Sequence, residues 1–469
     1  MNITAKIIYC VFTSLALEFL ALLPHAKAVS PPPDGGYPGG NTAEGQKALF
    51  SLATGRFNTA VGWKSLQTNS TGQFNTGIGA GTLDLNTADQ NTAVGTATLL
   101  LNSTGTNNTA NGAFALVLNA SGSDNTAVGA FALENNTASG NTAVGRSALV
   151  ANTSGGLNTV IGASAAVNNT TGHDNTGIGL NVLFSNVDGS FNTAVGRATM
   201  GGNTSGTNNT AVGWSALAAN SVGNGNTAVG SQALINSTGS DNTATGTGAL
   251  SANTSGIGNT GVGNNVLESN TTGSGNVALG DFAGFSATTG DNNVYIGAVG
   301  GVAGESDACY IASIFGGTSA NGIPVLINAA NKLGTTTSSK RFKDQIKPMD
   351  KASEAIFALR PVSFHYKKEI DPAGISQFGL VAEEVENVNC DLVVRDKEGK
   401  PYSVRYDQVN AMLLNEFLKE HSRVEKLEAT VVQQRKDFET AIAELRGQIH
   451  KVGTQIELSK AARQTADNR

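Results

Sequence analysis

Apolar residues recur at a fixed spacing along more than half of the chain. A short motif, Asn-Thr-Ala-Val-Gly or a close variant, returns every 16 or 17 residues between residues 41 and 297. In a typical copy, which begins at Asn125, the third residue after the Asn is branched and apolar (Val128) and the eighth is Leu (Leu133). Sixteen copies at such regular intervals predict a repeat architecture. They begin at Asn41, Asn58, Asn75, Asn91, Asn108, Asn125, Asn141, Asn158, Asn175, Asn192, Asn209, Asn226, Asn242, Asn259, Asn276 and Asn293.

Each copy predicts one coil of a solenoid. A polar cluster such as Asn69-Ser70-Thr71-Gly72 separates the Leu from the next Asn, and these residue types favour turns. We therefore predict two short strands and two turns per coil, with the branched residue and the Leu buried. Asn111 and Thr245 replace the branched residue and predict weaker coils. We expect each anchor Asn to bond to its counterparts in the coils above and below.

The predicted core of such a roll is thin. Burying one apolar side chain contributes about 1.5–3 kcal/mol, whereas ordering one backbone residue costs about 1–2 kcal/mol. Additional copies of the chain, intertwined or side by side, would add buried surface. We therefore expect a homo-oligomer, most simply a homotrimer.

Repeats such as Asn125-Thr126-Ala127-Val128-Gly129 resemble those of the YadA-like heads of trimeric autotransporter adhesins. Those heads are left-handed parallel β-rolls, and their period is shorter than 16 residues. The resemblance implies a β-roll and a trimer for residues 41–297, and it leaves the mode of surface attachment open.

The repeats also allow other functions. Asn-x-Ser/Thr triplets are glycosylation acceptors in some secretory pathways, and a regular Thr array is a candidate ice-binding face. Trp63 and Trp214 occupy equivalent places after the motif Gly, where they are candidates for an exposed ligand contact. We expect any ligand to be a host surface or a glycan, but the residues do not identify it.

Charge divides the chain in two. Of its 30 Lys and Arg residues, eight precede Ser338 and 22 follow, although the later part is much the shorter. The net charge of -6 and the lack of clustered basic residues argue against nucleic acid as a partner. Gly-x-Gly pieces such as the one at Gly77 predict turns and not a phosphate-binding loop, because no helix follows them. We expect no metal and no cofactor.

The N-terminus predicts export. Lys6 precedes an apolar run over residues 7–23, and Ala26-Lys27-Ala28 follows, so residues 1–28 have the pattern of a signal peptide cleaved after Ala28. A membrane anchor is the alternative, but the run is short and contains Glu18. Residues 29–40 are rich in Pro and Gly and predict a flexible linker. We expect a secreted or cell-surface protein without a membrane span in the mature chain.

The period stops after residue 297, and residues 298–337 predict a cap and neck that shield the open edge of the roll. Four blocks follow in a fixed order: Ser338-Ser339-Lys340-Arg341-Phe342-Lys343, then residues 359–366, 378–386 and 404–407. In this order they resemble the peptidase S74 domain, the intramolecular chaperone of endosialidase and other phage tail spikes and fibres. The resemblance covers about residues 338–420, and we assign residues 338–412 to this domain.

The resemblance implies self-cleavage between Thr337 and Ser338, with Ser338 as nucleophile and Lys343 as its partner. A Lys takes a proton from a Ser hydroxyl only when its amine is neutral, which burial or nearby positive charge favours. The reaction would occur once per chain, without an external substrate. Ser339 and Glu383 replace the Asp and Gln that the family commonly has. We interpret His365 as a packed strand residue rather than a third catalytic group.

Residues 413–458 predict a coiled-coil helix. Apolar residues recur there at intervals of three and four, interrupted by Gln434, with Lys, Glu and Arg on the flanks. We expect residues 459–469 to form a frayed tail.

The parts predict one function together. A roll of near-identical coils preserves most contacts when one chain slides past another by a repeat, so something must set the register. The sequence predicts an exported, homotrimeric fibre or adhesin whose C-terminal domain templates assembly and then cleaves itself off. The alternative is a fibre that keeps this domain as a structural cap. A phage origin is a third possibility, which the signal peptide disfavours.

Overall fold

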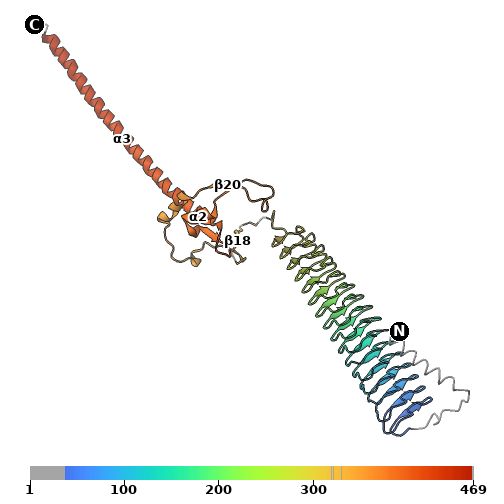
Figure 1. Cartoon of the computed structure of the whole chain (residues 1–469). Helices are drawn as coiled ribbons and strands as arrows, with labels where there is room; N and C mark the ends of the chain where they lie inside the picture. The colour runs from blue at the N-terminus through green and yellow to red at the C-terminus, as the bar shows by residue number, and fades with distance from the viewer. Residues whose placement is uncertain (1–36, 318, 321, 329, 467–469) are drawn as a thin grey trace. The chain divides into compact units, whose positions relative to one another are not determined.

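A computed structural model describes residues 37–317, 319–320, 322–328 and 330–466 of the chain. These residues form two compact units that divide after Gly317. Figure 1 shows a stack of short parallel strands in the first unit, and small sheets with one long helix in the second. The predicted signal peptide, residues 1–28, lies outside the described residues.

The first unit, here called the roll, is a parallel β-solenoid, as predicted. Each coil contributes one strand of three residues to a single sheet. The strands are β1 (Thr42–Glu44), β2 (Thr59–Val61), β3 (Thr76–Ile78), β4 (Thr92–Val94), β5 (Thr109–Asn111), β6 (Thr126–Val128), β7 (Thr142–Val144), β8 (Thr159–Ile161), β9 (Thr176–Ile178), β10 (Thr193–Val195), β11 (Thr210–Val212), β12 (Thr227–Val229), β13 (Thr243–Thr245), β14 (Thr260–Val262), β15 (Val277–Leu279), β16 (Val294–Ile296) and β17 (Cys309–Ile311).

Equivalent residues of successive coils lie side by side. Ala127 of β6, for example, pairs with Ala143 of β7, and the same register holds along the sheet. The sheet includes one strand more than the sixteen predicted copies, because β17 pairs in parallel with β16. In β17 the anchor Asn is replaced by Ala308, whose amide nitrogen still donates to Asn293 Oδ1 at 2.9 Å.

The residues that fill the roll differ from those predicted. The middle residue of each strand from β1 to β16, usually Ala, is buried, as Ala127 is, whereas the branched residue after it is exposed or half-buried (37% exposed at Val128). Side chains alternate across a strand, so the first and third residues of β6 share the outer face. The prediction that the branched residues are buried was therefore wrong, and Asn111 and Thr245 replace surface residues rather than core residues.

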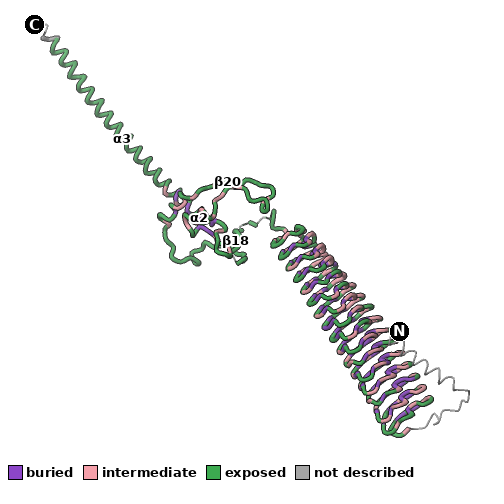
Figure 2. Tube along the Cα trace, in the orientation of Figure 1, coloured by how far each residue is buried: buried purple, intermediate pink, exposed green. Residues whose placement is uncertain are grey.

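The second predicted strand is also wrong. In the described coils, the segment that carries the eighth residue forms turns, and Leu133 is fully buried there with a φ of 52°. A positive φ costs an L-residue roughly 1–2 kcal/mol, and burial of the Leu side chain offsets this cost. The residue before this turn, Gly129, has to be glycine. A Cβ there would lie 2.5 Å from the carbonyl oxygen of Gly145 in the next coil. Figure 2 shows the buried positions following one another from coil to coil.

Tyrosines fill the C-terminal end of the roll. Tyr295 takes the inward place that Ala has in most strands and is fully buried, with its ring stacked on Tyr310 at 5.8 Å. Gly284 and Gly301 stand where most coils have the buried Leu. A Cβ on either glycine would lie 2.7 Å from the Tyr295 ring. The large and small residues have thus exchanged places at this end.

The second unit is a small α+β structure followed by a long helix, as predicted. Three antiparallel pairs join β18 (Val325–Ile327) to β19 (Leu333–Thr335), β20 (Val362–Phe364) to β21 (Gln377–Gly379), and β22 (Val393–Arg395) to β23 (Pro401–Val404). The helical segments are η1 (Lys340–Phe342), η2 (Asp350–Ala358), α2 (Ala382–Val388), η3 (Cys390–Leu392) and α3 (Tyr406–Ala466). Its buried apolar core consists of Val385, Leu392, Val393, Val404 and Met412.

Helix α3 is longer than the predicted coiled coil. It continues through Ala466, so the prediction of a frayed tail from Ser459 was wrong for these residues. The apolar residues of the predicted seam are exposed, for example Val424 at 47% and Leu445 at 56%. Pairs such as Arg435 and Glu439, 3.1 Å apart, lie along its surface. Among the described helices, none combines the length and the hydropathy needed to cross a membrane.

Candidate functional site

The short helix η1 brings Ser338 and Lys343 together. Its turn is closed by two backbone hydrogen bonds, from Phe342 N to Ser339 O and from Lys343 N to Lys340 O, both 3.1 Å. The chain reverses over this turn, and Lys343 Nζ donates to Ser338 Oγ at 3.0 Å. The two residues that the sequence pairs are therefore within hydrogen-bonding distance.

The Ser338–Lys343 pair is open to solvent. Both residues are exposed, and so are their neighbours over residues 335–348. The guanidinium carbon of Arg341 lies 4.6 Å from the centre of the Phe342 ring, which orders one of the nearby positive charges. A hydrogen bond from an amine to a hydroxyl places the two groups but does not activate the Ser, because a base must be neutral to accept its proton.

The structure does not bring His365 to this pair. His365 follows the end of β20 and is exposed, so the prediction of a packed strand residue was wrong. Glu383, at the start of α2, is exposed as well. Its neighbour Glu384 accepts a 3.0 Å hydrogen bond from Arg360 Nε. This hydrogen bond lowers the pKa of Glu384 and raises the pKa of Arg360.

A polar cluster that the sequence did not reveal joins η2 to α3. Glu416 of α3 accepts hydrogen bonds from the hydroxyl of Ser353, which is fully buried, and from Lys419 Nζ at 2.6 Å. Lys419 Nζ also donates to the carbonyl oxygen of Asp350 at 2.7 Å. The Lys419 and Ser353 hydrogen bonds lower the pKa of Glu416. We call Ser353, Glu416 and Lys419 the latch, because they fasten the first turns of α3 to the domain.

The predicted Asn ladder is present in the roll. Asn125 donates from its backbone nitrogen and from Nδ2 to Asn108 Oδ1, both at 3.1 Å, and its Nδ2 also donates to Ala138 O at 2.9 Å. The anchor Asn side chains are buried, and the pattern repeats from Asn58 to Asn293 with one variation at Asn91 and Asn141. Each buried amide is thus satisfied by the neighbouring coil.

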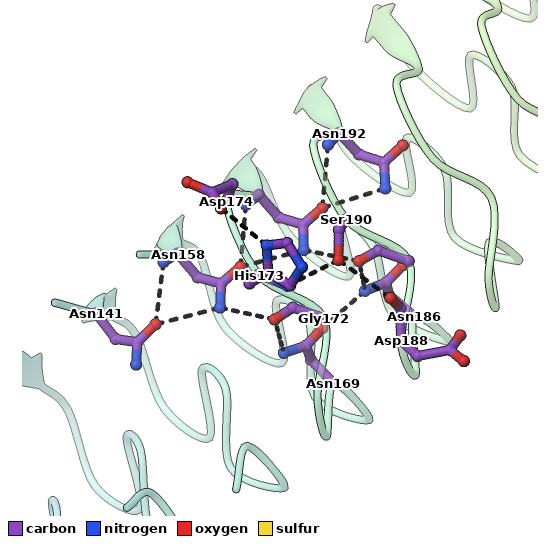
Figure 3. Close-up of polar contacts among 12 residues, drawn as sticks. Asn141, Asn158, Asn169, Gly172, His173, Asp174, Asn186, Asp188, Ser190 and Asn192 are labelled. Atoms are coloured by element: carbon purple, nitrogen blue, oxygen red, sulfur yellow. Dashed lines mark hydrogen bonds and ion pairs between the residues drawn. The ribbon is translucent and has the colours of Figure 1, made fainter. Parts of the chain in front are cut away.

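A second Asn ladder runs beside the first. Asn119 Nδ2 donates to Asn102 Oδ1 at 3.1 Å and to Gly122 O at 2.8 Å. Figure 3 shows both ladders, with Asn158 bonded to Asn141 and Asn186 bonded to Asn169. The signal was present in the sequence, because an Asn recurs eleven residues after most anchors. The polar composition around these Asn residues predicted only a turn.

The second ladder bears on the glycosylation alternative. Asn102 and Asn169 begin Asn-x-Ser/Thr triplets, and both side chains are buried and hydrogen-bonded within the roll. Their repetition therefore follows from the architecture and not from sugar attachment. Asn236 also begins such a triplet and is itself exposed, whereas the next residue, Ser237, takes the ladder position and accepts a hydrogen bond from Asn253 Nδ2.

The described residues contain no group of His, Cys, Asp and Glu side chains that could hold a metal ion. Trp214 is 51% exposed, and Trp63 is covered in part by Lys64, whose Nζ lies 4.7 Å from the ring centre. The two Trp residues are therefore not equivalent in their surroundings.

Comparison with known proteins identifies one region. Residues 338–394 match the model of the Peptidase_S74 family, described as chaperone of endosialidase. The match begins at Ser338 and includes Lys343, and it confirms the resemblance that the sequence blocks indicated. No curated protein matches the chain.

Proposed function

We propose that this protein is an exported, homotrimeric fibre whose C-terminal domain aligns the chains and then cleaves itself off between Thr337 and Ser338. The hydrogen bond between Lys343 and Ser338 is the observation that carries the proposal, because it lies where the chaperone-family match begins. The adhesin-like roll is the product, and the C-terminal domain is the assembly device.

The roll needs such a device. Its strands repeat Thr, Ala and a branched residue in the same register, so a shift of one coil preserves most contacts between two chains. The exposed helix α3 carries one row of apolar residues along its length. Three such helices would pack through these rows and hold three chains together at one end. Assembly would then proceed from the C-terminal end of the roll toward Asn41.

The cleavage step is an acyl transfer within one chain. Ser338 Oγ attacks the carbonyl carbon of Thr337, and the bond from that carbon to the Ser338 nitrogen breaks. The hydroxyl proton passes through Lys343 to the freed amino group, which leaves an ester between Thr337 and Ser338. Water then hydrolyses the ester to a Thr337 carboxylate and a Ser338 hydroxyl. Burial of the exposed pair in the trimer would favour the neutral amine.

Replacement of the nucleophile tests this proposal. We expect Ser338→Ala to leave one full-length band on a denaturing gel, while the matched control Ser339→Ala still yields two fragments. N-terminal sequencing of the smaller fragment should begin at Ser338. A fragment with another N-terminus, or cleavage that persists in Ser338→Ala, would contradict the assigned dyad.

Retention of the domain as a trimeric cap is the second candidate. Exposure of both Ser338 and Lys343 favours it, because a Lys that activates a nucleophile is usually desolvated. A single uncut band from fully assembled wild-type protein would support this alternative. The fibre and its alignment by the C-terminal domain would then stand without the cleavage step.

A further inference from the structure

The outer face of the roll's sheet is an apolar stripe. The third residue of most strands is branched and lies exposed, in register with its neighbours above and below. Eleven of these side chains are 36–52% exposed, and they form a row that Asn111 of β5 and Thr245 of β13 interrupt. They are Val61, Ile78, Val128, Ile161, Ile178, Val212, Val229, Val262, Leu279, Ile296 and Ile311.

A row of Thr residues accompanies this stripe. The first residue of each strand from β1 to β14 is Thr, and it shares the outer face with the third residue. Within the first and third positions of all seventeen strands, Glu44 is the only charged residue. Two copies of this face can therefore meet without repulsion between like charges along β2–β17.

The face becomes more apolar toward the C-terminal end. In β15, β16 and β17 the Thr gives way to Val277, Val294 and Cys309. The third residues there are Leu279, Ile296 and Ile311, so six consecutive outer positions carry no hydroxyl group. At the other end, β1 carries Thr42 and Glu44.

We infer that the first and third residues of β1–β17, here called the outer face, are the surface through which copies of this chain pack against one another in the fibre. This inference rests on the proposed homotrimer and adds its contact surface and its starting point. Packing begins at β15–β17, where the face is most apolar, and proceeds toward β1.

The occupant is a second copy, because the periodicity demands a partner with the same spacing. Rows of side chains recur along the sheet at the strand separation of ~4.8 Å over seventeen strands. An identical chain, related by rotation about the fibre axis, presents the same rows at the same heights. A globular partner would match only a few coils.

The area of the face suits an interface between copies. Burying the exposed parts of the eleven branched side chains would remove on the order of 500 Å² per copy from water. The Thr row adds to this, which brings the face to the scale of ~800 Å² per partner in stable complexes. The interior of the roll is already packed within one chain and contributes nothing to association. Burial of the outer residues would therefore stabilise the assembled fibre in addition.

Cys309 offers a direct probe, since it lies exposed on the outer face in β17. The full chain with Cys10→Ser and Cys390→Ser keeps Cys309 as its single thiol. We expect a short bismaleimide to link Cys309 between copies, on a gel of the assembled protein, at a level at least tenfold above that of the same protein dissociated in denaturant.

Polar substitutions supply the second arm. Asn111 already occupies the third position of β5 and Thr245 that of β13, so the roll accepts polar residues there. The triple variant Val262→Asn, Leu279→Asn, Ile296→Asn should lower Cys309 linkage at least tenfold and make the fibre dissociate at lower denaturant. Val222→Asn is the matched control, because Val222 is 55% exposed in a turn away from the sheet, and it should behave as the parent.

The outcomes separate this inference from the proposed function. Trimers by analytical ultracentrifugation without Cys309 linkage, and with the triple variant unchanged, would overturn the outer face as the contact while the trimer stands. Monomers at all concentrations would overturn both. A monomer whose inhibition of ice recrystallisation is abolished by the triple variant would make the same face an ice-binding surface and overturn the inference.

Discussion

The roll and the C-terminal unit handle their polar groups and their apolar side chains in opposite ways. In the roll, rows of Asn amides are buried and bonded coil to coil, around an interior of Ala and Leu. In the C-terminal unit five apolar residues form the core, and most ion pairs, such as Arg360 with Glu384, lie at the surface. The roll pairs its buried Asn side chains within one chain, but its repeats do not fix the register between two chains. The C-terminal unit is small, yet nothing in it repeats.

Under the proposed function, this difference gives the two units separate roles in assembly. A repeated interior provides stability that grows with each coil, because every coil contacts only its neighbours. A domain without repeats provides one alignment, because only one arrangement satisfies its contacts. Substitutions in the roll should therefore change stability, and substitutions in the C-terminal unit should change how chains are aligned.

The largest effect should come from the interior of the roll. Leu133→Ala removes a fully buried side chain in the middle of the stack, and we expect a loss of about 2–5 kcal/mol in the free energy of unfolding. Chemical denaturation of the full chain, followed by circular dichroism, measures it. Val222→Ala, at an exposed turn position, is the control and should change stability by less than about 0.5 kcal/mol. Equal effects would contradict the assigned core.

Breaking the Asn ladder should have the next largest effect. Asn125→Ala removes the side-chain amide, whose Nδ2 donates to Asn108 Oδ1 and to Ala138 O. Both of these buried oxygen atoms then lose a hydrogen bond. We expect a loss of about 1–3 kcal/mol. Asn168→Ala is a matched control, because Asn168 is exposed and belongs to neither ladder. Its Nδ2 donates to Phe184 O of the next coil. A loss at Asn168 as large as that at Asn125 would argue against the buried ladder.

The latch should matter for assembly and should depend on pH. Hydrogen bonds from Lys419 and Ser353 lower the pKa of Glu416 in the folded state. The stabilisation from ionised Glu416 is therefore fully present at pH values above the ordinary pKa of a Glu carboxyl. It is lost as the pH falls through the lowered pKa of Glu416. We expect Glu416→Gln to reduce the yield of trimer at neutral pH. Acidification should then reduce the yield of this variant less than that of the parent protein. Analytical ultracentrifugation measures both yields.

Glu420→Gln provides the control for the latch. Glu420 lies one turn further along α3 and is exposed, with its carboxylate 3.5 Å from Arg423. If both variants assemble with the same pH profile, the latch has no part in alignment.

The smallest effect should come from the surface pair of the C-terminal unit. Arg360→Ala removes an exposed ion pair with Glu384, and such pairs contribute little because water and salt screen them. We expect unchanged assembly and no measurable change in the unfolding midpoint at moderate salt. A clear loss of trimer in this variant would mean that the pair orients α2 in the assembled protein.

Much of the architecture could be predicted from the chain alone. The spacing of the anchor Asn residues predicted the parallel stack and the Asn ladder, because identical residues at a fixed period lie above one another in a solenoid. The order of blocks after Ser338 predicted the chaperone domain, which the family match confirms. The period of three and four predicted the long helix, although its end at Ala466 was missed.

Other features could not be predicted, for physical reasons. A strand of three residues has too few alternations to show which side faces inward, so Val128 was assigned to the core in place of Ala127. The turn that holds Leu133 at a positive φ has no pattern that distinguishes it from a strand. The latch joins Ser353 to Glu416 across 63 residues, a distance over which one sequence carries no signal of contact.

The amino-acid sequence by itself determined the repeat, the direction of the strands and the long C-terminal helix, because each depends on spacing along the chain. Only the tertiary structure decided what lies inside the coils and what lies outside. The interior of so narrow a coil has room for Ala opposite Leu, and that limit of volume turns the branched side chains outward. The apolar stripe that we assign to fibre packing is a consequence of this limit.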